Sequence, residues 1–147
     1  MLLAEKVCLI TGGGSGIGEA TAKLFASEGA FVIITDVDEK AANRVVSEIG
    51  PKAKFINCDV TQEKQVHDTI KKIVEIYDRL DCAVNNAGIT GTPSNIEHTT
   101  LENLSNVIAV NLTGVFLCLK HEITQMIKQG SGSIVNVSSG AGLIAVP

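Results

Sequence analysis

The chain has 147 residues, of which 45% are hydrophobic and 19% charged, with a formal net charge of -4. This length suits one domain with its own core, and an acidic balance without a basic cluster argues against nucleic acid as a partner. No apolar run approaches the roughly 20 residues that span a bilayer, and the first six residues lack a targeting signal, so we expect a cytoplasmic protein without a membrane partner.

Short apolar runs alternate with helical patterns along almost the whole chain. Several runs are continuously apolar, as in strands that are buried on both faces. We predict five strands, at residues 7–11, 31–35, 53–57, 81–85 and 133–138. The spacing of apolar residues predicts helices at residues 19–27, 39–49, 62–77 and 101–128, the last breaking near residues 111–114.

This alternation requires a parallel sheet with helices on both faces, because parallel strands need long right-handed crossovers. The predicted fold class is α/β, a doubly wound parallel sheet of the Rossmann type with three layers (α/β/α) and five strands. We predict a single NAD(P)-binding domain over residues 1–147, with its ligand at the carboxyl ends of the strands.

The most informative stretch is residues 11–18, Thr-Gly-Gly-Gly-Ser-Gly-Ile-Gly, between the first strand and the first helix. Backbone N–H groups at a helix N-terminus can hold a pyrophosphate without a basic side chain. Gly12 permits a sharp turn, Gly16 a close approach of the phosphates, and Gly18 close helix packing. No Gly-Lys-Ser/Thr follows, which argues against a triphosphate loop. The predicted cofactor contacts in this turn are Gly12, Ser15, Gly16, Ile17 and Gly18.

Asp36 closes the second predicted strand, eighteen residues past Gly18. A carboxylate at this point can accept both hydroxyls of an adenosine ribose. The next residue is Val37 and the glycine turn has no Lys or Arg, so NAD is favoured over NADP. The alternative is that Asp36 is a loop acid or a cap for the helix after Asp38.

Polar residues also follow the third and fourth predicted strands. Asp59 could accept from an adenine amino group beside the Val60 backbone, or could cap the helix near Thr61. Residues 85–88, Asn-Asn-Ala-Gly, would bring Asn86, Ala87 and Gly88 close to a cofactor ribose, or would form an ordinary loop.

The four cysteines are far apart and form no C-x-x-C pair. Each lies in or beside an apolar stretch, so we predict buried free thiols and no metal site. They are Cys8, Cys58, Cys82 and Cys118.

Together and in this order, these motifs resemble those of the classical short-chain dehydrogenase/reductase family. The resemblance includes the turn at residues 11–18, the acid at 36, Asp59-Val60, residues 85–88, Asn111 in Val-Asn-Leu-x-Gly, and Gly-Ser-Ile-Val-Asn-Val-Ser-Ser at residues 132–139. It implies an NAD-dependent oxidoreductase that transfers hydride between nicotinamide and a secondary alcohol or ketone. It also implies a homo-oligomer, paired through the long helix.

The resemblance further implies two catalytic residues. Ser139, rather than its neighbour Ser138, corresponds to the serine that hydrogen-bonds the substrate oxygen. Asn111 corresponds to the asparagine that holds a water in a proton relay. In the family, a Tyr-x-x-x-Lys pair follows this serine by about a dozen residues, and its lysine lowers the tyrosine pKa.

The printed sequence ends at Pro147, before that pair, and its single tyrosine is Tyr77, which we expect to pack in the core. We therefore expect the 147-residue chain to be catalytically crippled, with an apolar sheet edge exposed. The alternative function is an inactive dinucleotide-binding regulator or scaffold. A nucleotide-sugar epimerase is disfavoured because its glycine turn is usually shorter. The substrate walls are predicted at residues 90–98 and 140–146.

Overall fold

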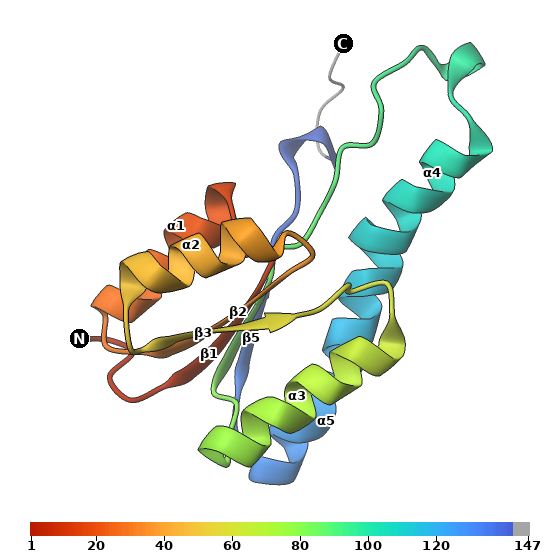
Figure 1. Ribbon diagram of the computed structural model, residues 1–147. Helices are drawn as coiled ribbons and strands as arrows, with labels where there is room; N and C mark the ends of the chain where they lie inside the picture. Colours follow the sequence, from red (N-terminus) through yellow and green to blue (C-terminus); the bar gives the residue numbers. More distant parts are fainter. Residues whose placement is uncertain (143–147) are drawn as a thin grey trace.

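The computed structural model describes residues 1–142, which form a parallel sheet in the order β3-β2-β1-β4-β5 (Figure 1). This confirms the α/β, doubly wound fold class. β4 begins one residue later than predicted, and β5 ends two residues earlier. The strands are β1 (Val7–Thr11), β2 (Phe31–Asp36), β3 (Ala53–Asn57), β4 (Cys82–Asn85) and β5 (Ser133–Asn136).

The helices follow the predicted ranges with one informative difference. The first helix starts at Gly16, three residues earlier than predicted, so the last glycines of the turn already belong to its first turn. The α-helices are α1 (Gly16–Ser27), α2 (Glu39–Ile49), α3 (Glu63–Tyr77), α4 (Leu101–Ile108) and α5 (Val115–Gln129). Shorter segments are η1 (Ile96–His98), the π-helical η2 (Ala109–Gly114) and η3 (Gly140–Gly142).

Helices cover both faces of the sheet, with α1 and α2 on one side and α3 and α5 on the other (Figure 1). Successive side chains of a strand point to opposite faces. Cys8 and Ile10 of β1 therefore pack in the cluster that includes Ala22 of α1, while Leu9 packs in the cluster that includes Ile73 of α3. Both clusters are buried, which explains the unbroken apolar sequence of β1.

The segments α4, η2 and α5 form one helix of 29 residues, and α4 projects away from the sheet (Figure 1). The predicted break near residues 111–114 is a π-helical widening rather than an interruption. By length and composition alone this helix could cross a bilayer. However, α5 packs on α3 and the sheet and buries Glu122, as the core helix of a globular domain does.

Among the described residues, β5 forms one edge of the sheet. Its side chain Val135 is 54% exposed, and Val137 just beyond it is also exposed. Within residues 1–142, this strand therefore has exposed apolar side chains, as expected.

Candidate functional site

The glycine turn is held in place by the end of β4. Gly12 has a φ of +64°, in the left-handed region that favours glycine. The Asn86 Nδ2 donates to the backbone oxygens of Thr11 and Gly12, at 3.0 Å each. The Thr11 Oγ1 accepts from the backbone N–H groups of Asn86 and Ala87, also at 3.0 Å. These four hydrogen bonds fix the turn relative to β4.

Gly18 packs against this same turn. A Cβ at Gly18 would lie 2.2 Å from the Gly12 carbonyl oxygen and 2.5 Å from Asn86 Nδ2. Such distances are far inside van der Waals contact, so only glycine allows α1 to approach the turn this closely. We predicted that Gly18 allows close packing of the helix. In the structure its nearest neighbours are the Gly12 carbonyl and the Asn86 side-chain amide.

The first turn of α1 faces open space. Ser15 is the N-cap residue and its side chain makes no cap hydrogen bond. A Cβ built on Gly16 would meet no atom within 4 Å. The N–H groups in the first turn of any α-helix have no intrahelical acceptor and lie at the positive end of its dipole. This arrangement suits an anionic group above Gly16.

Asp36 lies beside the turn and is bonded to it. Its Oδ2 accepts from the Gly14 N–H at 2.9 Å, and its Oδ1 accepts from the Asp38 N–H at 2.9 Å. A carboxylate oxygen can accept a second hydrogen bond, so both oxygens retain acceptor capacity. The Asp38 side chain, rather than Asp36, caps α2 by accepting from the Ala41 N–H.

Arg44 of α2 also reaches the glycine turn, which the sequence did not reveal. Its Nη2 donates to the Gly14 carbonyl oxygen at 3.2 Å. The guanidinium also pairs with Glu19 of α1 and with Glu48 of α2. Hydrogen bonds from Arg44 and Lys23 lower the pKa of Glu19 to about 2. The charge of Arg44 is therefore neutralised by carboxylates on two helices.

Asp59 follows β3 and serves in a local turn. Its Oδ1 accepts from the Thr61 N–H at 2.9 Å and from the Thr61 Oγ1 at 2.8 Å. The N-cap residue of α3 is Gln62, and no side-chain hydrogen bond caps this helix. Asp59 therefore bonds a residue of the preceding turn and does not cap α3, and it also lines the cavity described next.

The carboxyl ends of the strands enclose a cavity of about 400 Å³. It gathers nine of the eleven predicted cofactor residues from four separate stretches of chain, while Gly18 and Ala87 are not among its lining residues. The nine are Gly12, Ser15, Gly16, Ile17, Asp36, Asp59, Val60, Asn86 and Gly88. Four further residues complete the wall: Val37, Cys58, Ile89 and Val110.

Asn111 lies in the π-helical segment and holds the loop after β4. Its Oδ1 accepts from the Ile89 N–H at 2.9 Å, and its Nδ2 donates to the Ile89 carbonyl oxygen at 2.8 Å. A Cβ on Gly88 would lie 3.4 Å from the Asn111 Oδ1. The side chain is therefore oriented at the margin of the cavity, and it keeps one N–H and one lone pair free of these two bonds.

Ser139 follows β5 and is not among the residues that line the cavity. Its Oγ accepts from the Ala141 N–H at 3.1 Å, and its side chain is exposed. Since β5 pairs with β4, Ser139 leaves the sheet at the same carboxyl edge. Of the predicted substrate walls, residues 90–98 are exposed or half-buried, and residues 143–146 lie outside the described part of the chain.

Tyr77 is half-buried and packs against the core cluster between the sheet and α3, which agrees with the expected packing role. Its ring packs against that of Phe31 with the centroids 5.4 Å apart, and burial raises its pKa. The four cysteines are free, and all but the half-buried Cys82 are buried. No group of three potential metal ligands occurs among residues 1–142.

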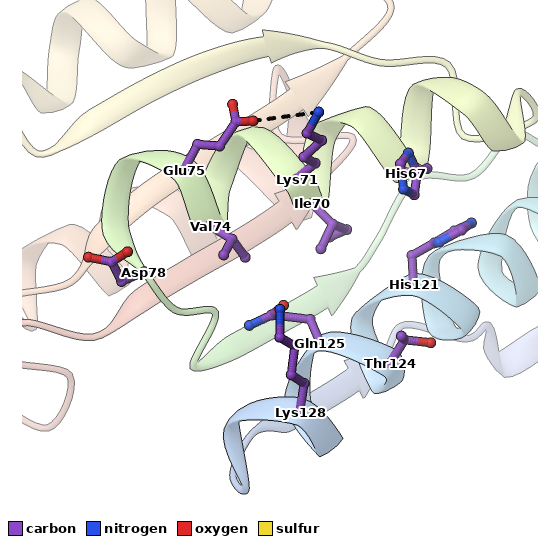
Figure 2. Close-up of a pocket in the computed structure, with 10 residues that line it drawn as sticks. All are labelled: His67, Ile70, Lys71, Val74, Glu75, Asp78, His121, Thr124, Gln125 and Lys128. Atoms are coloured by element: carbon purple, nitrogen blue, oxygen red, sulfur yellow. Dashed lines mark ion pairs between the residues drawn. The ribbon is translucent and has the colours of Figure 1, made fainter.

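A second opening of about 440 Å³ lies between α3 and α5 (Figure 2). The rings of His67 and His121 meet there edge to face, 5.3 Å apart. Lys71 and Glu75 form an ion pair along its rim. Its lining comes from these two helices alone, so no strand end contributes to it. The fold and the strand-end cavity together define a doubly wound α/β protein of the Rossmann type.

Comparison with known proteins extends this assignment. A family model described as short chain dehydrogenase matches residues 6–147. The chain is 40% identical over 146 residues to a 2,5-dichloro-2,5-cyclohexadiene-1,4-diol dehydrogenase of Sphingobium indicum. The matched region covers 99% of this chain and 58% of the relative. The chain belongs to the short-chain dehydrogenase family.

Two solved structures are also similar. One is the 3-ketoacyl-(acyl-carrier-protein) reductase of Brucella melitensis complexed with NADH, with a TM-score of 0.89, 38% identity, and coverage of 95% of this chain and 59% of that one. The other is NAD+-bound xylitol dehydrogenase, with a TM-score of 0.96, 35% identity, and coverage of 100% and 58%. The chain thus spans less than two thirds of each of these proteins.

Proposed function

We propose that the strand-end cavity binds NAD(H) and that the protein to which this chain belongs is an NAD-dependent oxidoreductase. The observation that carries the proposal is the convergence of the open helix start at Gly16 with the Asp36 carboxylate in one cavity. The similar NADH- and NAD+-bound structures support the same cofactor.

The residues present fit a dinucleotide with its pyrophosphate at the start of α1. Unpaired N–H groups would hold the phosphates there. The second acceptor positions of Asp36 would take the hydroxyls of the adenosine ribose. Asp59 and Val60 would flank the adenine, while Asn86, Ala87 and Gly88 would border the second ribose.

We propose NAD rather than NADP because a 2′-phosphate would meet the Asp36 carboxylate. Arg44 could offset that repulsion only by leaving its bonds to Glu19 and Glu48. Breaking several charge-assisted hydrogen bonds is costly. The ion pairs on α1 and α2 therefore favour the cofactor without the extra phosphate.

Bound nicotinamide would supply or accept the hydride at its ring. We propose that Ser139 hydrogen-bonds the substrate oxygen and that Asn111 holds a water with its free N–H and lone pair. The named relatives act on a diol, a 3-ketoacyl group and xylitol, all of which carry hydroxyl or ketone groups. The proposed substrate class is therefore a small secondary alcohol or ketone.

A second function has one observation in its favour. Ser139 lies outside the lining of the strand-end cavity. The alternative is a dinucleotide-binding regulator or scaffold without turnover. We further propose a cytoplasmic homo-oligomer that binds neither nucleic acid nor membrane, to be checked by cell fractionation and light scattering.

Titration with NADH tests the binding proposal, because nicotinamide fluorescence changes on transfer to a protein site. We expect saturable binding that free ADP-ribose displaces. Absence of saturable binding by folded protein would refute it. NAD+ reduction by the protein to which this chain belongs, with a panel of secondary alcohols, then separates the two functions: turnover supports the oxidoreductase, and binding without turnover supports the regulator.

A further inference from the structure

The structure contains a fully buried acid that the proposed function does not use. Glu122 of α5 has 0% relative exposure and faces the sheet. The only other buried acid among residues 1–142 is Asp81, which accepts from the Val7 N–H and pairs with Lys6 and Arg79. Glu122 has no cationic partner in this part of the chain. An isolated buried carboxylate is costly, so this acid needs another explanation.

Its hydrogen bonds run to the ends of two strands. The Glu122 Oε2 accepts from Asn85 Nδ2 at 3.0 Å. The same Nδ2 donates to the Asn136 Oδ1 at 3.0 Å. Both hydrogens of the Asn85 amide are thereby used, which fixes the orientation of its side chain. The network joins α5, the end of β4 and the end of β5.

Two atoms of this network lack a partner. They are the Glu122 Oε1 and the Asn85 Oδ1, both buried acceptors. They belong to neighbouring groups that already share one hydrogen bond. A proton on Oε1 would turn one of these acceptors into a donor for the other. Acid and amide would then form a cyclic pair with two hydrogen bonds.

We propose that Glu122 is a positioning residue whose protonated form makes this cyclic acid–amide pair with Asn85. The pair holds the carboxyl ends of β4 and β5 together. Asn85 precedes Asn86, which braces the glycine turn, and Asn136 lies three residues before Ser139. The inferred role of Glu122 in positioning the cofactor cavity and Ser139 rests on the proposed function, whereas its protonation does not.

The electrostatic surroundings agree with a neutral acid. Burial raises the pKa of Glu122 to about 7, against the opposing effect of the Asn85 hydrogen bond. On the same helix, burial raises the pKa of the Cys118 thiol, and Cys58 packs beside it. The neighbouring His121 lies near Glu63 and His67 of α3 instead. On the sheet side, Asn85 and Asn136 are uncharged.

Infrared spectroscopy tests the protonation directly. The wild-type chain should show the C=O band of a buried carboxylic acid one pH unit below about 7, fading as the pH rises. The band should be missing from the Glu122→Gln variant, whose amide can make the same cyclic pair. If wild type and Glu122→Gln absorb equally in the region of the carboxylic acid C=O band at that lower pH, Glu122 is ionised and the proposal is wrong.

The positioning role is tested with NADH titrations of Glu122→Gln and Glu122→Leu. We expect Glu122→Gln to keep wild-type affinity. Glu122→Leu leaves one N–H of the Asn85 amide without its acceptor and should bind NADH about tenfold more weakly. Wild-type affinity in both variants would overturn the positioning role. If the wild type itself does not bind NADH, the proposed function fails, and the infrared band still decides the state of Glu122.

If Glu122→Leu does not fold, the proposal is tested instead by the pH dependence of the free energy of unfolding in urea, measured for wild type and Glu122→Gln. A raised pKa in the folded state means that the fold binds this proton more tightly, so wild-type stability should fall as the pH rises from about 4.5 through 7. Glu122→Gln should lose that slope. The same slope in both proteins would contradict the proposal.

Discussion

The two largest differences between the strand-end cavity and the α3–α5 groove lie in where their walls come from and in how their polar groups are held. The volumes are similar, about 400 and 440 Å³. The cavity takes its wall from the ends of several strands and the helices that follow them. The groove takes its wall from two helices (Figure 2).

The polar groups of the cavity are fixed by the backbone. Asp36, Asn86 and Asn111 each make two hydrogen bonds to main-chain atoms. In the groove, Lys71 and Glu75 are exposed and, among residues 1–142, form an ion pair only with each other. Exposed ion pairs are weak and screened by salt. The comparison teaches that fixed, convergent polar groups, rather than volume, mark the better candidate site.

The largest expected effect comes from Gly18→Ala. The new Cβ would overlap the Gly12 carbonyl oxygen and push α1 away from the turn. We expect NADH affinity to fall at least about tenfold, measured by fluorescence titration. Gly130→Ala is the matched control, because Gly130 has a φ of +81° and open space around it. It should cost about 1 kcal/mol of stability without changing NADH affinity. Equal affinity in the two variants would contradict the role of Gly18.

The next effect comes from Asn86→Ala, which removes both hydrogen bonds from the side chain to the glycine turn. We expect a loss of about 1–3 kcal/mol in the free energy of unfolding and a several-fold weaker affinity for NADH. Asn103→Ala is the control, since Asn103 also makes two hydrogen bonds to the backbone, away from the cavity: its Oδ1 accepts from the Thr92 N–H and its Nδ2 donates to the Thr92 carbonyl oxygen. Weaker NADH binding in the control as well would show that the loss is not specific to the cavity.

A smaller effect is expected from Glu19→Gln, which weakens the grip of Arg44 on the Gly14 carbonyl oxygen. Hydrogen bonds from Arg44 and Lys23 lower the pKa of Glu19 from 4.5 to about 2. Its stabilising contribution is therefore present above about 4.5 and lost as the pH falls through about 2. Urea midpoints of wild type and Glu19→Gln should differ at neutral pH and converge in acid. A difference that persists in acid would exclude this ion pair as its cause.

The smallest effect is expected from the groove. His67→Ala and Lys71→Ala should leave NADH affinity within about twofold of the wild type, because neither residue lines the strand-end cavity. A clear loss of affinity in either variant would remove the distinction between the two openings.

The fold was predictable because local patterns and global topology agree in this chain. Continuous apolar runs indicated strands buried on both faces, and the spacing of the turn at residues 11–18 indicated the cofactor side of the sheet. Residues at the ends of parallel strands meet at one edge, which is why Asp36, Asp59 and Asn86 could be placed together.

The remaining features depend on packing between segments that are distant in the sequence. Arg44 resembles any exposed helical arginine until α2 is placed against α1. Glu122 resembles a surface acid until α5 covers β4 and β5. The start of α1 at Gly16 was missed because glycines in a sequence indicate a turn, whereas the contacts of Gly18 with Gly12 and Asn86 depend on the folded structure.

The most direct test of the account is a parallel titration of the wild-type chain and Asp36→Ala with NADH and NADPH. We expect the wild type to bind NADH more tightly than NADPH. Asp36→Ala should weaken the binding of NADH and relieve the repulsion between the Asp36 carboxylate and the 2′-phosphate of NADPH. The preference should therefore shift toward NADPH. Tighter binding of NADPH by the wild type, or an unchanged preference in Asp36→Ala, would contradict the role assigned to Asp36.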